Sequence, residues 1–133
     1  MKRVFVASVL LLAVSATSSF AQDRNQKRLE KALKRLDPST RLEQVCDAAA
    51  MSRIAKDNKG FRVDRSVVSA LEEPHAKGDT LIGKGAALRS KGKWYRYSFT
   101  CRATPDRLSV LSFEYKLGTE IPEAQWSQYG LYQ

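Results

Sequence analysis

The residues best suited to binding chemistry form a run of positive charge in the second half of the chain. Between Thr80 and Arg102 there are six basic residues and no acidic one, namely Lys84, Arg89, Lys91, Lys93, Arg96 and Arg102. Trp94 lies within this run, and an aromatic ring beside cations can stack on a sugar or base while the cations hold phosphate groups. We therefore expect a ligand-binding surface made by Arg89, Lys91, Lys93, Trp94 and Arg96. The alternative is a solvated strand face on which Trp94 packs against a loop or a terminal helix.

Residues that could catalyse a reaction are few. Glu43 and Asp47 are four positions apart, so on a helix they share one face and could do acid–base chemistry in a cleft, although such pairs are usually solvated. His75, the single histidine, follows Pro74 in an expected loop. The sequence has no nucleophile elbow, glycine-rich phosphate loop or metal-ligand cluster. We expect no catalytic residue, no metal and no cofactor; a hydrolase built from Glu43, Asp47 and His75 is the least favoured alternative.

The chain has two cysteines, Cys46 and Cys101, and no Cys-x-x-Cys motif. An even pair in a protein outside the cytoplasm indicates one disulfide, with two buried free thiols as the alternative. The bridge would stabilise the fold by about 4 kcal/mol through loop entropy.

The N-terminus has the pattern of a secretory signal peptide over residues 1–21. Lys2 and Arg3 precede an apolar run from Val4 to Val14, which is too short to span a bilayer, and small residues follow up to Ala21. We expect cleavage near Ala21–Gln22, a periplasmic or secreted protein, and no transmembrane segment in the mature chain. A retained membrane anchor is the alternative.

Residues 22–133 are expected to form a single α+β domain. A basic amphipathic helix is predicted over Asp23–Leu36, because Leu29, Leu33 and Leu36 follow helical spacing. A second helix runs to about Lys56 and starts either with a capping box at Thr40 and Glu43 or with Asp37 as cap before Pro38.

The remaining pattern is typical of an antiparallel sheet of three or four strands. Strands are predicted over Ser66–Glu72, Thr80–Arg89, Trp94–Ala103 and Leu108–Leu117, the second of them weakened by Gly83 and Gly85. In the last strand, Leu111, Phe113, Tyr115 and Leu117 are predicted to share the apolar face. Ile121–Leu131 is expected to form a short C-terminal helix. The fold class is therefore two N-terminal helices packed on the sheet, with Cys46 and Cys101 on the core faces of their elements.

Four segments carry a resemblance to a known family. They are the run from Leu36 to Asp47, the stretch Lys91–Tyr95 with Phe99–Cys101, the run Phe113–Gly118, and Ile121–Glu123 before Trp126. Together they resemble the domain of unknown function 930, a family of small bacterial proteins found mainly in rhizobia and their relatives, over about residues 29–131. The resemblance implies a Gram-negative, periplasmic setting and cysteines that belong to the family pattern, but no activity. Its most recognisable stretch contains Arg41, Glu43, Gln44 and Asp47, which form either a binding site or a hydrogen-bond network between helix and sheet.

The positive net charge indicates an anionic partner, with a role in solubility alone as the alternative. The chain has 23 Lys and Arg against 14 Asp and Glu, a net charge of +9. Outside the cytoplasm such a protein meets anionic envelope glycans, lipids or proteins before it meets nucleic acid. We expect a non-catalytic protein that binds one of these partners through the basic hairpin. A protein–protein interaction module, such as an inhibitor or assembly factor, is the alternative.

Overall fold

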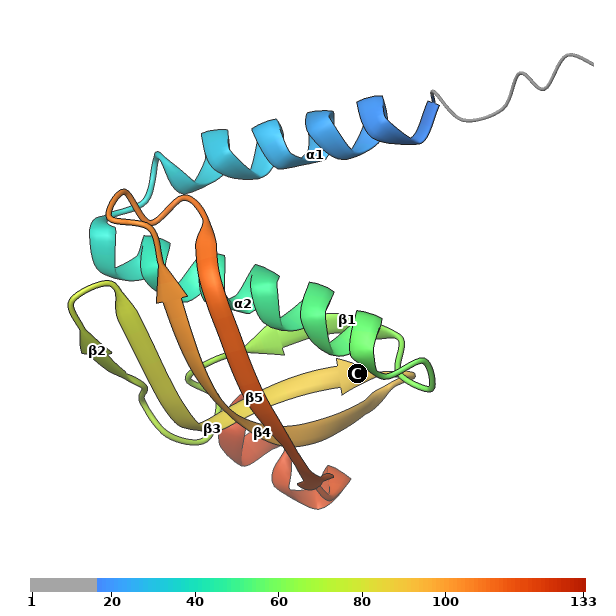
Figure 1. Cartoon of the computed structure of the whole chain (residues 1–133). Helices are drawn as coiled ribbons and strands as arrows, with labels where there is room; N and C mark the ends of the chain where they lie inside the picture. Colours follow the sequence, from blue (N-terminus) through green and yellow to red (C-terminus); the bar gives the residue numbers. More distant parts are fainter. Residues whose placement is uncertain (1–16) are drawn as a thin grey trace, which may run out of the picture.

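Two helices precede an antiparallel sheet of five strands in a computed structural model that describes residues 17–133 (Figure 1). The helices are α1 (Thr17–Leu33) and α2 (Pro38–Asp57), and the strands are β1 (Val63–Val67), β2 (His75–Lys77), β3 (Thr80–Ser90), β4 (Lys93–Ala103) and β5 (Val110–Glu120). The sheet order is β1-β3-β4-β5, and β2 pairs with the same edge of β3 as β1 does. The predicted α+β class is confirmed. Residues 1–16 of the predicted signal peptide lie outside the described part of the chain.

The helix α2 begins at the second of the two predicted starts. The Asp37 carboxylate accepts hydrogen bonds from the backbone N–H groups of Ser39 and Thr40, both at 3.1 Å, and Pro38 occupies the first helical position. These bonds satisfy backbone donors that have no partner inside the helix. At the other end the Asn58 N–H donates to the carbonyl of Ile54. Both ends of α2 are therefore specified by local sequence.

A disulfide between Cys46 and Cys101 joins α2 to β4, as the sequence predicted. The two Cα atoms are 6.0 Å apart, and both residues are fully buried. Around the bridge, the apolar face of α2 packs on what we call the inner face of the sheet. This core contains Leu42, Val45, Ala50, Ile54, Leu81, Leu88, Tyr97, Phe99 and Phe113. The bridge thus lies in the centre of the main core.

The helix α1 contacts the rest of the molecule through its C-terminal end. Leu33 is buried, and Leu29 and the following Leu36 pack partly against the main core, whereas residues 20–28 are exposed. The predicted helix therefore forms, although it begins at Thr17 rather than Asp23 and ends three residues earlier than expected. Among residues 17–133, no helix has the length and apolar composition needed to cross a membrane.

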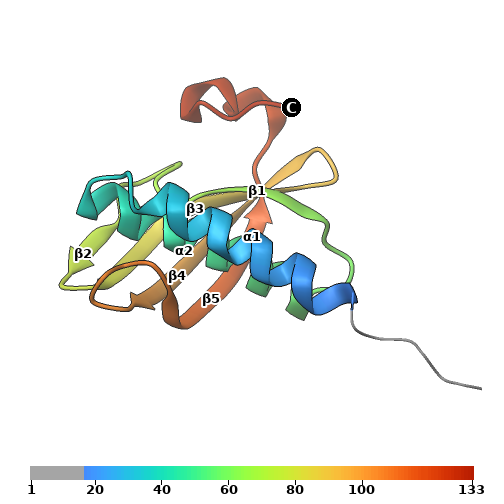
Figure 2. The same ribbon diagram turned by 90° about the horizontal axis from the view of Figure 1, so that it is seen from above.

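The C-terminal segment covers part of the opposite, outer face of the sheet. Where a single short helix was predicted, the chain forms two 3₁₀ helices, η1 (Glu123–Gln125) and η2 (Ser127–Tyr129), which lie away from both α-helices (Figure 2). A second apolar cluster of Ala87, Trp94, Ile121, Trp126 and Leu131 lies beneath them. The Trp126 Nε1–H donates to the Ile121 carbonyl at 2.9 Å. The sheet is therefore covered on its outer face at the end where the β3–β4 turn lies.

Two irregularities change which side chains face the core. In β3 the pairing with β4 shifts between Gly83 and Ala86, so the irregularity indicated by Gly83 and Gly85 is present. In β5, Ser112 pairs with Arg102 but Val110 pairs with Ala103, which leaves Leu111 as an extra residue. Leu111 is 58% exposed, and its predicted place in the apolar core is wrong because the bulge interrupts the alternation of the strand, so that Val110 packs against the core instead. The first strand is also displaced: it spans Val63–Val67 instead of Ser66–Glu72.

Replacing both cysteines by alanine should lower the free energy of unfolding by about 4 kcal/mol, because the bridge closes a loop of 55 residues that is otherwise free in the unfolded chain. Urea unfolding followed by circular dichroism would measure the change. Treatment with a reductant should produce a similar loss in the wild type and none in the double variant. A loss below about 1 kcal/mol would contradict the loop-entropy argument.

Candidate functional site

The expected hairpin is present, but its aromatic residue is not available to a ligand. The turn between β3 and β4 is formed by Lys91 and Gly92, which have positive φ angles of 52° and 75°. Trp94 follows directly and is 1% exposed, because the C-terminal segment packs over it. Its Nε1–H donates to the Tyr132 carbonyl at 2.8 Å. The expectation that Trp94 supplies an open stacking surface is therefore wrong.

Two of the four expected hairpin cations are held in ion pairs. The Arg89 guanidinium makes two hydrogen bonds to the Asp64 carboxylate, at 2.9 and 3.0 Å, and its Cζ lies 5.8 Å from the centre of the Trp94 ring. Arg89 thereby lowers the pKa of Asp64. Lys93 Nζ lies 3.3 Å from the Glu120 carboxylate. Arg89 and Lys93 therefore help to fasten β1 and β5 to the hairpin, and the five predicted residues do not form one binding surface.

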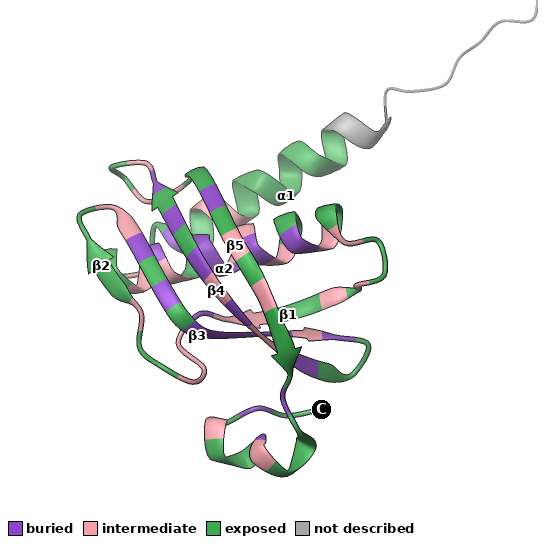
Figure 3. Ribbon diagram, turned by 60° about the horizontal axis from the view of Figure 1, so that its bottom comes forward, coloured by how far each residue is buried: buried purple, intermediate pink, exposed green. Residues whose placement is uncertain are grey.

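A different group of cations meets on the uncovered part of the outer face. Lys84 on β3, Arg96 on β4 and Lys116 on β5 surround a hollow of about 170 Å³ that Ser98 and Gly118 also line. We call these five residues the cationic hollow. Along the strands, exposed residues alternate with buried ones, and the C-terminal segment lies at one end of the strands (Figure 3). The run of positive charge contained Lys84 and Arg96, whereas Lys116 was missed because it comes from the next strand.

Arg41, in the family's most recognisable stretch, has a structural role. Its guanidinium donates to the carbonyls of Leu33 at 3.0 Å and Leu36 at 2.9 Å, at the C-terminal end of α1. It also donates to the carbonyl of Asp106, at 3.1 Å, in the turn between β4 and β5. One side chain thus joins the end of α1, the start of α2 and the sheet.

Asp47 also belongs to a hydrogen-bond network between helix and sheet. Its carboxylate accepts a hydrogen bond from Ser66 Oγ at 2.8 Å, and the Ser66 and Tyr97 hydroxyls are 2.6 Å apart. When Asp47 is ionised, Ser66 donates to it and Tyr97 donates to Ser66, because each hydroxyl has one hydrogen. Burial raises the pKa of Asp47 to about 7, opposed by the hydrogen bonds from Ser66 and the backbone of Val68. Arg41 and Asp47 thus both take part in hydrogen bonds that join the helices to the sheet.

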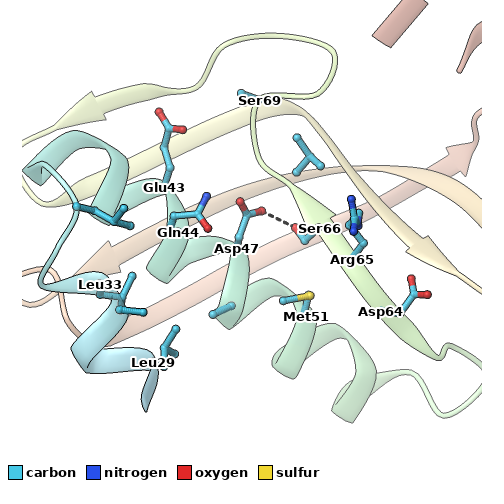
Figure 4. A pocket seen from close by; sticks show the side chains of 14 residues that line it. Leu29, Leu33, Glu43, Gln44, Asp47, Met51, Asp64, Arg65, Ser66 and Ser69 are labelled. Atoms are coloured by element: carbon cyan, nitrogen blue, oxygen red, sulfur yellow. Dashed lines mark hydrogen bonds between the residues drawn. The ribbon is translucent and has the colours of Figure 1, made fainter. Parts of the chain in front are cut away.

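Glu43, Gln44 and Asp47 nevertheless line a pocket between α1, α2 and β1, with a volume of about 510 Å³ (Figure 4). Apolar side chains come mainly from the two helices: Leu29, Ala32, Leu33, Leu36, Ala48 and Met51. Polar groups on the opposite side come from β1 and the residues after it: Asp64, Arg65, Ser66 and Ser69. Burial, together with the charges of Glu73 and Asp37, raises the pKa of Glu43. The pocket therefore combines an apolar wall with carboxyl groups that bind protons more readily than usual.

His75 does not join these carboxyl groups. It is an exposed residue of β2, paired with Ile82 of β3, and it is not among the residues that line the pocket. The hydrolase alternative required Glu43, Asp47 and His75 to converge in one cleft, and that convergence does not occur.

In a comparison with protein families, the family model described as Domain of Unknown Function (DUF930) matches residues 33–131. No curated protein and no solved structure matches the chain.

The raised pKa of Asp47 gives a prediction for stability against pH. Its pKa is about 7 in the folded protein and 3.8 in the unfolded chain, so between these values the folded state binds more protons than the unfolded state. The contribution of Asp47 should therefore be most favourable below about pH 4 and decrease as the pH rises to about 7. Asp47→Asn keeps an acceptor for Ser66 but removes the titration. Relative to this variant, the wild type should lose about 1–4 kcal/mol over that range in urea unfolding.

The control is Glu114→Gln, which removes an exposed carboxylate on the other side of the sheet and should leave the pH profile unchanged. Parallel profiles for the wild type and Asp47→Asn would show that Asp47 titrates normally in the folded protein.

Proposed function

The chain belongs to the family of the domain of unknown function 930, whose name assigns no activity, and we propose a function from the geometry of the cationic hollow. The protein is non-catalytic and binds an anionic component of the cell envelope through this hollow. The observation that carries this proposal is the meeting of Lys84, Arg96 and Lys116 around Ser98. Of the five hairpin residues predicted to bind a ligand, Arg96 lines the hollow, whereas Arg89, Lys91, Lys93 and Trp94 do not.

The cationic hollow has the groups needed to hold a phosphate or carboxylate. Among the described residues, none of its three cations forms an ion pair, so each is available to a ligand. Arginine can donate two parallel hydrogen bonds to an oxyanion, lysine adds compact charge, and the Ser98 hydroxyl can donate a further bond.

Gly118 keeps the hollow open beside Arg96. A Cβ atom at position 118 would lie 3.1 Å from the Arg96 Cβ and 3.2 Å from its carbonyl oxygen. A side chain at position 118 would be too close to the Cβ and carbonyl oxygen of Arg96 and would occupy space that a ligand needs. The glycine therefore leaves the Arg96 side chain accessible from the β5 side.

The compartment supports an envelope ligand. The Cys46–Cys101 disulfide is favoured in an oxidising environment outside the cytoplasm, and the N-terminal pattern of residues 1–21 predicts export. In that setting the mature chain, with a net charge of +7 once Lys2 and Arg3 are removed, meets lipid phosphates, lipopolysaccharide and acidic cell-wall polymers. The shared chemistry of these partners is a surface-displayed phosphate or carboxylate.

Neutralising the cationic hollow should weaken binding to anionic envelope material. The triple variant Lys84→Gln, Arg96→Gln and Lys116→Gln removes three exposed or half-exposed charges and should lose about tenfold in affinity. Binding would be measured by co-sedimentation with anionic phospholipid vesicles, lipopolysaccharide and peptidoglycan over a series of salt concentrations. The wild-type interaction should fade as the Debye length falls from about 10 Å at 0.1 M to about 3 Å at 1 M salt.

The matched control is Lys31→Gln, Lys59→Gln and Lys91→Gln, which removes the same charge from exposed positions elsewhere on the surface. Equal weakening in the two triple variants would mean that net charge, not the hollow, drives binding. Absence of wild-type binding at low salt would overturn the proposed function and favour a protein partner.

A further inference from the structure

We propose that the pocket between α1, α2 and β1 is a second binding site, which takes a small amphipathic amine: an alkyl chain with a positively charged head group. This site is on the helix side of the sheet and is independent of the cationic hollow. The proposal rests on a cavity of about 510 Å³, an apolar wall, and an excess of carboxyl groups over cations in the lining.

The apolar wall is contributed by α1 and α2. From α1 and the residues after it come Leu29, Leu33 and Leu36, and Ala48 and Met51 come from α2. Within α1, Leu29 to Leu33 covers about 6 Å at 1.5 Å per residue, and Leu36 extends the wall beyond the end of the helix. The volume of the pocket is within the usual range for small-molecule pockets and leaves room for a short alkyl chain.

The polar side of the pocket favours a cation. Figure 4 shows Glu43, Gln44 and Asp47 on the side of α2 that faces the strand bearing Ser66. Among the described residues, Glu43 has no ion-pair partner, so its carboxylate is open to a ligand. An ammonium group has three donors, and Glu43, Asp47 and the Gln44 carbonyl supply acceptors within the same pocket.

The charges around the pocket select against an anion. Its lining contains three carboxyl groups (Glu43, Asp47 and Asp64) and one cation, Arg65; α1 contributes no charged side chain. Asp64 is already paired with Arg89, while the carboxylates of Asp37 and Glu73 lie close enough to raise the pKa of Glu43. The pocket is thus locally acidic on a protein of net charge +9. A cationic head would relieve the repulsion between these carboxylates, and an anionic head would add to it.

Isothermal titration calorimetry with octylamine, octanol and octanoate tests the head group while the chain length stays constant. Octylamine should bind saturably, octanol about tenfold more weakly, and octanoate not measurably, because a charge-assisted hydrogen bond adds about 1.5–3 kcal/mol. Equal affinity for octylamine and octanol would overturn the proposal, because the pocket would then recognise only the alkyl chain.

The variant Glu43→Gln removes the open carboxylate from a half-buried position and should weaken octylamine binding about tenfold. The control Glu114→Gln removes a carboxylate from the outer face of the sheet and should leave the affinity unchanged. An unchanged affinity in Glu43→Gln would show that the amine does not bind between the two helices and β1 as proposed.

The pH dependence provides a second readout. Octylamine stays cationic up to about pH 10, so any change below about pH 8 comes from the protein. Affinity should rise between about pH 5 and 8 as Asp47 loses its proton, and this rise should be smaller in Asp47→Asn. A pH profile that is the same in both proteins would exclude Asp47 from the site.

Discussion

A covalent bond between α2 and β4 lies at the centre of the contact between the helices and the sheet. Cys46 and Cys101 are buried in the centre of the main core, so the bridge, together with the apolar contacts around it, restrains the helix on the sheet. Asp47 is the next residue after Cys46, and the same bond therefore fixes its carboxyl group opposite Ser66 on β1. Arg41 extends this arrangement by binding the carbonyl groups at the end of α1. The bridge thus restrains α2, the helix that contributes to both the core and the helix-side pocket.

The sheet uses its two faces differently because the chain covers them with different segments. The inner face packs under α2 along most of its length, whereas the outer face is covered at one end, by the segment that follows β5. Trp94 and Arg96 point to the same outer face, but Trp94 lies under that segment and Arg96 beyond it. The boundary of this cover separates residues that hold the structure together from residues that a ligand can reach.

Much of the fold could be predicted because it depends on local patterns. Asp37 and Pro38 specify the start of α2, and the alternation around Tyr97 and Phe99 specifies the face of β4 that meets it. Leu111 was misplaced because a one-residue bulge is a property of the pairing between two strands rather than of either strand.

The sites were harder to predict, since they depend on contacts between distant segments. The sequence placed Trp94 beside the cations correctly, but not the C-terminal chain that covers it, nor the Asp64 carboxylate that binds Arg89. The family resemblance drew attention to Glu43 and Asp47, whereas the pocket wall from α1 appears only when the two helices are folded together.

The order of the strands along the chain has a consequence for the kinetics of folding. β3, β4 and β5 are consecutive and joined by short turns, so their contacts are local, and the three strands can assemble early. Docking of α2 brings together residues far apart in sequence and therefore follows at a greater entropic cost. Cys101 is already in place on the early sheet, whereas Cys46 arrives with the helix. The rate at which the thiols oxidise during refolding would thus report helix docking rather than strand assembly.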